Sequence, residues 1–588
     1  MAHLLWTSMI ASFVMISFYL GLAKSQKAPG YTFMKNAVES PVVSFYDYII
    51  VGGGTAGCPL AATLSRNARV LLLERGGSPY GNQNISNLVG FAQTLADNSP
   101  KSAAQQFVSE DGVPNARARV LGGGSCLNAG FYTRASMKYV QNAGWNQALV
   151  NESYRWVEET VAFEPLVQQW QSALRDGLVE VGVGPYNGFN LDHIYGTKIG
   201  GSIFDKHGNR HTAADLLRHA NWANLTVLLH ARVTKLLFRL RGRLRPLAHG
   251  VLYRDSAGKL HKAYIIKGSK NEIILSAGAI GSPQILMLSG VGPRRHLESM
   301  GIPVVLEQPM VGTGMSDNPM NALYVPSPTP VEVSLIQVVG ITRFGTYIEG
   351  ASGSNFAGAP ASSVDDQLQR KLGMFLPKII GPSKQPTLET IASAGEPRNN
   401  LAELAFRGGF ILEKIIGPLS KGELKLKNTN PDDNPSIRFN YFKQPKDLRR
   451  CVAGLKTIEQ VIQSKAFSKF TYPFLSIESL LNMTISFPVN KIPRHDSDSK
   501  SLEQYCRDTV MTIWHYHGGC QVGRVVDWDY RVMGVDALRV VDGSTFINSP
   551  GTNPQATVMM LGRYMGIKIL NERQRRRSAS QGEVCNRM

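Results

Sequence analysis

The sequence predicts a mixed α/β fold, in which a parallel sheet with flanking helices is interleaved with a second domain built on a mostly antiparallel sheet with helices. Residues 46–74 read as strand, glycine-rich turn, helix and strand, the order of a parallel βαβ unit. Residues 272–292 repeat a buried strand, a glycine turn and a helix, which can extend the same sheet. Residues 421–426 and 436–441 alternate polar and apolar side chains, as strands of a second sheet do.

The first unit carries a nucleotide-binding motif. Its apolar strand, residues 47–51, leads directly into G-x-G-x-x-G, whose glycines are Gly52, Gly54 and Gly57. Glycines at these positions allow a tight turn, close approach of the backbone to a pyrophosphate, and close packing of helix on strand. The following helix directs its free N–H groups at that pyrophosphate. Glu74 ends the next strand, where a carboxylate binds a ribose diol. The motif predicts a site for an adenine dinucleotide, either NAD or FAD.

The N-terminal residues predict passage through the secretory pathway. Residues 4–22 are mostly apolar and the chain turns polar after Ser25, which is typical of a signal peptide spanning residues 1–25. An uncleaved membrane anchor is the alternative. Sequons for N-glycosylation begin at Asn84, Asn151, Asn224 and Asn482. We expect a protein of the cell wall, the extracellular space or the ER lumen, with no membrane span after cleavage.

The cysteines are too few for a disulfide scaffold, since the chain has 6 in 588 residues. Cys58 and Cys126 lie within glycine motifs and are interpreted as buried thiols. Cys451 and Cys506 lie in segments with a helical pattern and are the candidates for one disulfide, although connectivity cannot be deduced from sequence.

The net charge of +19 suggests a nucleic-acid or anionic partner, but the distribution of charge argues against nucleic acid. Basic residues are dispersed, and the one dense run, 573–577, lies in a polar tail after the last predicted helix. The sequence contains no recognised nucleic-acid-binding motif. A basic surface suits an acidic cell-wall matrix or solubility alone. We therefore predict no nucleic-acid partner, and we expect a monomer.

Later motifs favour FAD over NAD. Residues 117–130 hold a second glycine cluster beside basic residues, which suits a backbone wrapped around a flat group or a phosphate. A strand over 538–542 ends at Asp542, from which a carboxylate reaches a ribityl or pyrophosphate oxygen. A helix with Pro554 in its first turn begins near Asn553, and its dipole stabilises negative charge on a reduced ring. These motifs need a partner longer and flatter than nicotinamide.

Together the motifs resemble the glucose–methanol–choline family of FAD-dependent oxidoreductases. Its signatures are carried by residues 119–128 and 278–292, and its C-terminal pair by His515 and Asn553. Residues 514–520 and 551–557 are most similar to the plant branch that holds the HOTHEAD proteins and the mandelonitrile lyases, and above all to HOTHEAD. The resemblance implies a Rossmann-like FAD-binding domain, an interleaved substrate domain and a small-molecule alcohol as substrate.

The resemblance also implies a cofactor site and domain limits. The residues that hold FAD would be Gly52, Gly54, Thr55, Ala56, Gly57, Glu74, Arg75, Val120, Gly124, Asn128, Ala129, Gly130, Phe131, Val233, Trp514, His515, Asp542, Gly543, Pro554 and Gln555. The FAD-binding domain would comprise residues 44–137, 201–320 and 513–572. A cap segment would span 138–200, the substrate-binding domain 321–512 and a basic tail 573–588.

His515 and Asn553 stand where family enzymes place their catalytic residues. Oxidation of an alcohol needs a base for the hydroxyl proton while a hydride leaves the carbon for the flavin, and a neutral imidazole suits that task. Asn553 can donate a hydrogen bond to the developing alkoxide. His517 is a rival base, but the family register favours His515.

Two positions distinguish oxidation from cyanohydrin cleavage. Mandelonitrile lyases of this branch carry Tyr and His where this chain has Ile513 and Asn553. The replacements leave one titratable group in a more apolar pocket, which favours oxidation of a hydrophobic alcohol such as a long-chain ω-hydroxy fatty acid. The alternatives are a mandelonitrile lyase with a non-redox FAD, and a catalytically silent glycosylated wall protein. Intact cofactor and base motifs argue against the silent protein.

Overall fold

The structure is a computed structural model that describes residues 29–268, 270–353, 408–485, 489–493 and 501–585, with the backbone alone after residue 574. The predicted signal peptide, residues 1–25, lies outside these residues. Within the described part of the chain, no helix combines the length and the apolar character that a membrane crossing requires.

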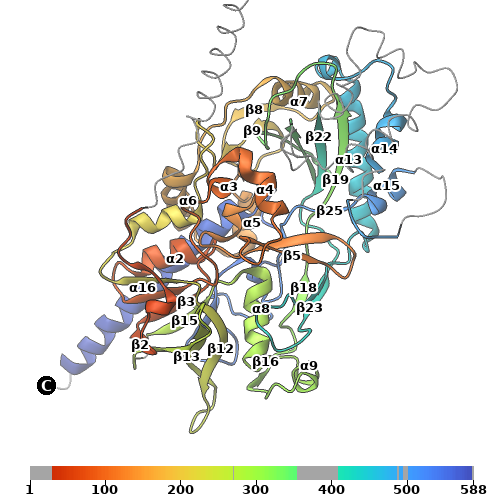
Figure 1. Cartoon of the computed structure of the whole chain (residues 1–588). Coiled ribbons are helices and arrows are strands. Elements are labelled where there is room, and N and C mark those ends of the chain that lie inside the picture. The colour runs from red at the N-terminus through yellow and green to blue at the C-terminus, as the bar shows by residue number, and fades with distance from the viewer. Residues whose placement is uncertain (1–28, 269, 354–407, 486–488, 494–500, 586–588) are drawn as a thin grey trace, which may run out of the picture.

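Strands from distant parts of the chain form one parallel sheet in the lower part of the molecule (Figure 1). In spatial order they are β1 (Met34–Asn36), β11 (Leu225–Leu229), β4 (Val70–Leu73), β3 (Tyr48–Val51), β15 (Glu272–Leu275) and β26 (Leu538–Val540). β3 and β4 are buried throughout, because short apolar runs of this kind are covered on both faces. The predicted mixed α/β fold is confirmed.

Alternate residues of the parallel strands serve two different cores. Ile50, Leu72 and Ile274 pack with helices α2 (Gly57–Leu64) and α16 (Gln555–Cys585). Ile49 and Leu71 face the opposite side, toward a four-stranded sheet. That sheet runs β12 (Arg232–Arg239), β13 (Leu247–Arg254), β14 (Leu260–Ile265) and β2 (Val43–Tyr46). The predicted strand–glycine–helix unit is also present, because β15 leads into α8 (Gly278–Leu288) and pairs with β3.

A seven-stranded sheet organises the second domain, at the upper right of Figure 1. Its spatial order is β25 (Met511–Thr512), β19 (Pro319–Pro326), β22 (Gly408–Ile415), β21 (Thr346–Ser352), β20 (Val338–Ile341), β9 (Gly196–Ile199) and β8 (Tyr186–Phe189), antiparallel except for the last pair. Helices α7 (Gln169–Glu180), α13 (Pro445–Gln463) and α14 (Ile477–Ile485) cover one face. The opposite face holds a smaller apolar cluster with Phe131 of the first domain.

Residues 321–400 carry scattered glycine, proline and serine with little periodicity, which predicts irregular structure. This prediction is wrong for the part of the region that the structure describes. It contains the rest of β19 together with β20 and β21, whereas residues 354–400 lie outside the described residues. These strands are almost entirely buried, so they lack the polar alternation of a half-exposed strand. Gly340 and Gly350 interrupt them because leucine side chains of α7 approach the backbone there.

Residues 78–114 are rich in asparagine, serine, glycine and glutamine, which predicts one long loop. The structure has short regular elements there instead. They are α3 (Gln83–Ser86), α4 (Phe91–Ala96) and β5 (Ala104–Val108), and β5 pairs with β6 (Pro114–Ala118). Asn82 and Asn87 accept hydrogen bonds from backbone N–H groups at the starts of the helical turns. The asparagines of this segment thus cap short helices, whereas the sequence alone suggested a loop.

The smaller elements connect these layers. The remaining helices are α5 (Met137–Asn142), α6 (Gln147–Val161), α9 (Arg294–Ser299) and α15 (Leu502–Asp508), and the helical turns include η3 (Gly123–Cys126), η4 (Ala213–His219) and η8 (Gly543–Thr545). The remaining strands are β7 (Phe131–Tyr132), β10 (Gly201–Ser202), β16 (Val291–Gly292), β17 (Leu306–Glu307), β18 (Thr313–Met315), β23 (Gly422–Lys425) and β24 (Ser436–Arg438).

The predicted states of four cysteines, one disulfide and two buried thiols, are confirmed. Cys451 on α13 and Cys506 on α15 form a disulfide. Cys58 and Cys126 are free and buried, and each thiol donates to a backbone carbonyl.

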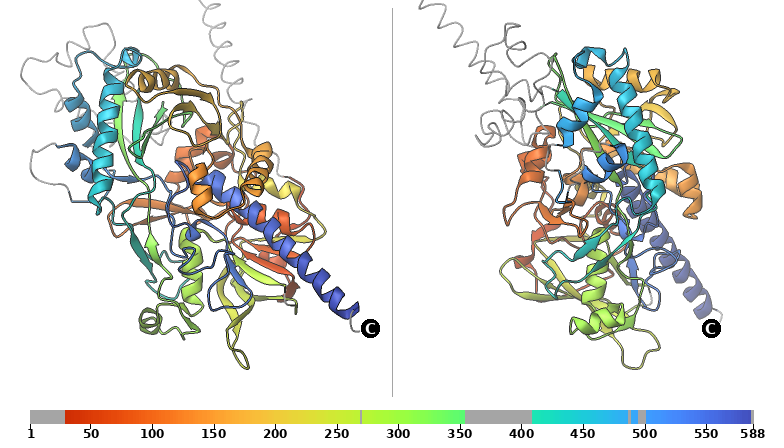
Figure 2. Two further views of the ribbon diagram at one scale, coloured as in Figure 1. Left: turned by 180° about the vertical axis from the view of Figure 1, so that it is seen from behind. Right: turned by 90° about the vertical axis from the view of Figure 1, so that its right-hand side faces the viewer.

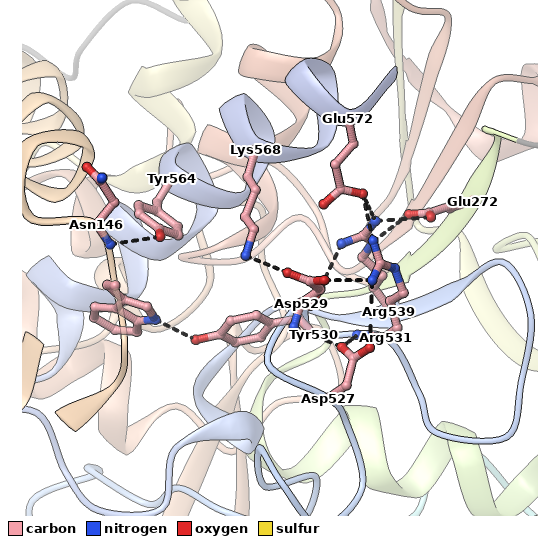
Figure 3. Close-up of polar contacts among 11 residues, drawn as sticks. Asn146, Glu272, Asp527, Asp529, Tyr530, Arg531, Arg539, Tyr564, Lys568 and Glu572 are labelled. Carbon is pink, nitrogen blue, oxygen red and sulfur yellow. Dashed lines mark hydrogen bonds and ion pairs between the residues drawn. The ribbon is translucent and has the colours of Figure 1, made fainter. Parts of the chain in front are cut away.

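Helix α16 is anchored by an ion-pair network (Figure 3). The buried guanidinium of Arg539 on β26 binds Glu272 at 2.6 Å and Glu572 on α16 at 2.7 Å. Lys568 binds Asp529 at 2.6 Å. The network therefore joins α16 to β15 and β26, which lead, as β3 does, into the cavity described below.

The helix is longer than the sequence predicts. The apolar pattern of this helix runs only to Leu570, which predicts its end there, before the predicted basic tail of residues 573–588. In the structure α16 continues to Cys585 and projects beyond the folded body (Figure 2). Arg573 is buried and donates to Asn271 at 2.7 Å and to Asp47 at 3.1 Å. The arginines and glutamines that follow are good helix formers, and no proline stands between Leu570 and Cys585, so no strong helix breaker ends the helix at Leu570.

Candidate active site

One cavity extends from the carboxyl ends of the parallel strands to the inner face of the seven-stranded sheet. One end is lined by the turn after β3 and by Glu74, and the middle by residues 123–131. The far end is lined by residues 513–516 and by Asn553. The predicted cofactor and catalytic residues come together around it, with the exception of Gly57.

The first glycine turn shows why two of its glycines are needed. A Cβ on Gly52, whose φ is +106°, would lie 2.4 Å from the carbonyl oxygen of Ser276. A Cβ on Gly57 would lie 2.0 Å from the carbonyl oxygen of Gly52. Gly57 is outside the cavity lining, and the close approach of the Gly52 carbonyl shows that it serves the packing of α2 on the turn.

Other glycines leave room that the protein itself does not fill. A Cβ on Gly54 or Gly124 would have no neighbour closer than 3.8 Å, and Gly543 has none within 4 Å. All three line the cavity. Backbone left bare beside open space is what a bulky phosphate-bearing ligand requires.

Glu74 is buried at the end of β4. Its carboxylate accepts hydrogen bonds from the N–H groups of Gly53, at 3.0 Å, and Gly76, at 2.7 Å. Burial raises the pKa of Glu74, and these N–H groups partly oppose the rise. A carboxylate has more than two acceptor positions, so Glu74 retains capacity for a ribose hydroxyl.

The two glycine clusters and the start of α16 are joined directly. The N–H of Gly122 donates to the carbonyl of Gly53 at 2.7 Å. Asn128 donates to the side chain of Gln555 at 2.8 Å, and Gln555 donates to the carbonyl of Phe131 at 2.6 Å. These bonds hold the middle of the cavity to its catalytic end.

Asp542 follows β26 and braces the turn beneath the cavity. It accepts hydrogen bonds from the N–H of Gly278 at 2.9 Å, the hydroxyl of Ser282 at 2.5 Å and the N–H of Ser544 at 2.8 Å. Burial raises its pKa, and the bonds to Ser282 and Ser544 oppose the rise. Asp542 therefore organises this wall as well as lining it.

His515 lines the cavity, whereas His517 does not. Burial lowers the pKa of His515 well below its usual range, and the neighbouring Lys414 and His517 lower it further. His517 is also buried, and its Nδ1 lies 2.9 Å from the carbonyl oxygen of His515. Burial lowers the pKa of His517 to about 3. The imidazole in reach of a substrate is that of His515.

Asn553 lies at the end of the loop that precedes α16. This loop is held by a side chain of the seven-stranded sheet. The carboxamide oxygen of Asn553 is buried without a hydrogen-bond partner among the described residues. Tyr347 on β21 donates to the carbonyl of the preceding residue, Thr552, at 3.0 Å. A bound ligand can supply the missing hydrogen-bond partner of this oxygen.

The cavity is also bordered by an ion pair that the sequence analysis did not predict. The sequence indicated a single titratable group in the pocket. Lys414 on β22 lines the cavity and binds Glu349 on β21, and both side chains are fully buried. Burial lowers the pKa of Lys414 and raises that of Glu349. Strand alternation could have placed Lys414 in the cavity wall, because Phe410, Leu412 and Lys414 share one face of β22. Residues 408–415 match no recognised motif, however.

The fold and this cavity define an oxidoreductase of the dinucleotide-binding class. It has nucleotide-binding glycines at one end and a histidine–asparagine pair beneath an antiparallel sheet at the other. The chain belongs to the GMC oxidoreductase family, whose N-terminal domain matches residues 46–320 and whose C-terminal domain matches residues 418–562. The predicted family is confirmed, and so is the cofactor, FAD, which fits the open glycine cradle and the free acceptor positions of Glu74.

Known proteins resemble the chain over most of its length. It is 54% identical to Protein HOTHEAD of Arabidopsis thaliana, over 90% of this chain and 89% of that protein. It is 48% identical to an (R)-mandelonitrile lyase-like protein of the same plant, over 93% and 94%. It is 44% identical to the sinalpyl alcohol oxidase Nec3 of Nesocodon mauritianus, over 90% and 89%. A crystal structure of formate oxidase has the same fold, with a TM-score of 0.70, 19% identity and coverage of 91% and 100%.

Proposed function

We propose that this FAD oxidoreductase oxidises the CH–OH group of a hydrophobic alcohol, with His515 as the base. The observation that carries the proposal is the position of His515 and Asn553 on one cavity whose remaining wall is largely apolar. Similarity to a sinalpyl alcohol oxidase supports the alcohol, and that enzyme's own substrate is not assigned to this chain.

The predicted FAD-binding residues, without Gly57, are proposed to hold the cofactor. The Gly52–Ala56 turn and Glu74 would bind the adenosine and pyrophosphate end, and residues 124–131 with Asp542 the middle. FAD, when bound, accepts the hydrogen that leaves the carbinol carbon with its electron pair. Gln555 and Asn128 hold the catalytic end of the cavity against residues 128–131 while this occurs.

His515 is suited to take the hydroxyl proton. Since burial lowers its pKa, the imidazole is neutral throughout the physiological range and has a free lone pair. The side-chain amide of Asn553 would donate a hydrogen bond to the oxygen from which the proton leaves, and it carries no charge that competes for that proton.

The cavity wall supports an apolar substrate. Phe91 and Leu95 of α4, Ile336, Leu412 and Ile513 all line it. A long-chain ω-hydroxy fatty acid is the substrate class we propose, because it offers a primary hydroxyl on an apolar chain.

Passage through the secretory pathway is part of the proposal. The disulfide between Cys451 and Cys506 supports an oxidising compartment. Of the predicted glycosylation sites, Asn84 and Asn151 are exposed, whereas the amide of Asn224 is bound to the carbonyl of Ser65 at 2.9 Å. Modification is therefore expected first at Asn84 and Asn151.

A second candidate is cyanohydrin cleavage. It is favoured by the similarity to a mandelonitrile lyase-like protein and by Lys414, whose ammonium group is near His515 and suits an anion such as cyanide. One measurement distinguishes the two candidate functions.

Anaerobic addition of an ω-hydroxy fatty acid to the holoenzyme bleaches the flavin absorbance if the enzyme oxidises alcohols. Cleavage of mandelonitrile while the flavin stays oxidised would contradict our proposal.

The base is tested by a matched pair of histidine variants. His515→Ala should slow flavin reduction by about 10²–10⁴-fold, the usual contribution of general-base catalysis, and leave FAD bound. His517→Ala should keep most of the rate, because its ring is outside the cavity. The reverse order of effects would move the base to His517.

A further inference from the structure

The segment Ser316–Asn318, between β18 and β19, lies against both catalytic segments. Ser316 and His517 exchange backbone hydrogen bonds of 3.0 and 2.8 Å. The amide of Asn318 donates to the hydroxyl of Ser549 at 3.3 Å, on the loop that leads to Asn553. Between them, Asp317 points at the segment that carries His515. One short connection thus supports both sides of the site.

Asp317 is buried, with a side chain that only accepts hydrogen bonds. Its Oδ1 accepts from the N–H of His515 at 3.0 Å. Its Oδ2 accepts from the hydroxyl of Thr512 at 2.6 Å and from that of Tyr441 at 2.5 Å. The hydroxyl oxygen of Thr512 in turn accepts from the N–H of Trp514 at 2.8 Å. Asp317 therefore fixes the backbone on both sides of Trp514.

The backbone at Trp514 needs such support. Its φ is +59°, in the left-handed region that costs a bulky L-residue roughly 1–2 kcal/mol. Its ring packs against the apolar clusters around Phe91 and Leu127. This turn aims His515 into the cavity, so any relaxation of Trp514 toward negative φ would move the imidazole.

We propose that Asp317 is the positioning residue of the site: its carboxylate, through the N–H of His515 and the hydroxyl of Thr512, holds the 512–515 turn in its strained conformation and so keeps His515 in reacting geometry. The inference rests on the proposed role of His515 as the base. Asp317 itself does not line the cavity and acts only through its neighbours.

Its protonation should loosen the turn. Burial raises the pKa of Asp317 to about 6, although its bonds to Thr512, Tyr441 and His515 oppose the rise. A proton on Oδ2 would have to be donated to the hydroxyl of Thr512 or Tyr441, which must then turn its own hydrogen away. At least one of the present hydrogen bonds to Asp317 would therefore be lost or reversed.

The other titratable groups around Asp317 do not change charge near pH 6. Tyr441, Tyr347 and Tyr516 surround it, and burial raises the pKa of each phenol, so they stay protonated. Burial keeps His515 neutral. As the pH falls through about 6, Asp317 takes up a proton and the rate of flavin reduction should fall with it.

The test compares Asp317→Asn with Asp255→Asn in the FAD-loaded enzyme. Asp255 is a matched control, because it is a buried carboxylate outside the cavity lining that accepts backbone N–H bonds of 2.9 Å from Ala257 and Lys259 in the turn between β13 and β14. Each variant is mixed anaerobically with an ω-hydroxy fatty acid between pH 5 and 9. Visible circular dichroism of the oxidised, bound flavin is recorded over the same range, because it reports the flavin's surroundings without turnover.

Asp317→Asn should bind FAD normally, reduce it about 10–100-fold more slowly at pH 8, and lose the acid limb of the rate and the step in dichroism near pH 6. Asp255→Asn should keep both. Tyr441→Phe, which removes one donor and leaves the carboxylate, should move the limb to higher pH, and this variant serves if Asp317→Asn does not fold.

A wild-type rate, or an unchanged step near pH 6, in Asp317→Asn overturns the inference. His515→Ala is measured in parallel. If its rate is normal, the proposed base is wrong, whereas a slow His515→Ala beside a normal Asp317→Asn overturns the role of Asp317 alone. If the substrate reduces no variant, the dichroism step still decides the question.

Discussion

The hydroxyl of Tyr347 lies 3.0 Å from the carbonyl oxygen of Thr552 and donates a hydrogen bond to it. The hydroxyl oxygen of Tyr347 also lies 3.4 Å from Nδ1 of His515. Tyr347 stands on β21 of the seven-stranded sheet, whereas Thr552 precedes Asn553 at the start of α16. A single side chain of the second domain therefore contacts both segments that carry the proposed catalytic pair.

Tyr347→Phe should slow flavin reduction by about fivefold, since one hydrogen bond contributes roughly 1 kcal/mol and its loss frees the Thr552 carbonyl. FAD content should not change. The control is Tyr253→Phe, which removes a buried hydroxyl that lies 2.9 Å from the hydroxyl of Ser40 and belongs to a residue outside the cavity lining. Stopped-flow measurement of flavin bleaching checks the prediction. Equal rates in the two variants would mean that Tyr347 does not position the loop.

Gly54→Ala should fold and lose FAD. A Cβ at Gly54 meets no protein atom closer than 3.8 Å, so the chain tolerates it, but the methyl group occupies the space that the pyrophosphate requires. Gly30→Ala is the control, because a Cβ there meets nothing within 4 Å and Gly30 is outside the cavity lining. The ratio of flavin absorbance to protein absorbance in the purified protein measures the effect. Full flavin content in Gly54→Ala would place the pyrophosphate elsewhere.

The nucleotide-binding half of the fold was predictable because its signals are local. The strand 47–51, the glycine turn and Glu74 lie within 30 residues of sequence, and Gly52 and Gly57 each have a steric reason for their identity. The second sheet was only partly predictable. β20 and β21 are buried on both faces, and a buried strand without polar alternation has the same composition as an irregular apolar segment.

The site divides in the same way. His515 and Asn553 lie in motifs, so the sequence indicates them, although their catalytic roles stay predictions. Asp317, Tyr347 and Lys414 lie on strands of the second domain or beside them, in no motif, and they reach the site only because the two sheets face each other across the cavity. Contacts between residues nearly 200 positions apart leave no pattern in a single sequence.

The buried pair of Lys414 and Glu349 predicts a large loss of stability when one partner is removed. Glu349→Gln leaves an ammonium group buried without its counter-charge, which typically costs about 3–5 kcal/mol. The double variant Glu349→Leu with Lys414→Met should recover most of this loss, because an apolar pair of similar volume needs no charge compensation. Thermal unfolding of the FAD-loaded enzyme at one fixed scan rate compares the two. A double variant less stable than Glu349→Gln would contradict the argument.

Substitution of both disulfide cysteines should lower the stability of the protein, whereas a reducing agent added to the folded protein should not. Cys451 and Cys506 close a loop of 55 residues between α13 and α15. The chain-entropy relation assigns about 4 kcal/mol to a loop of that length, so the double variant Cys451→Ala with Cys506→Ala should unfold at a clearly lower temperature. Cys126→Ala, a free and buried thiol, is the control for loss of a sulfur atom. Both disulfide sulfurs belong to fully buried residues, so dithiothreitol should leave the native midpoint unchanged and lower it only after an unfolding and refolding cycle. A native protein that loses stability as soon as dithiothreitol is added would show that α13 and α15 separate locally without global unfolding.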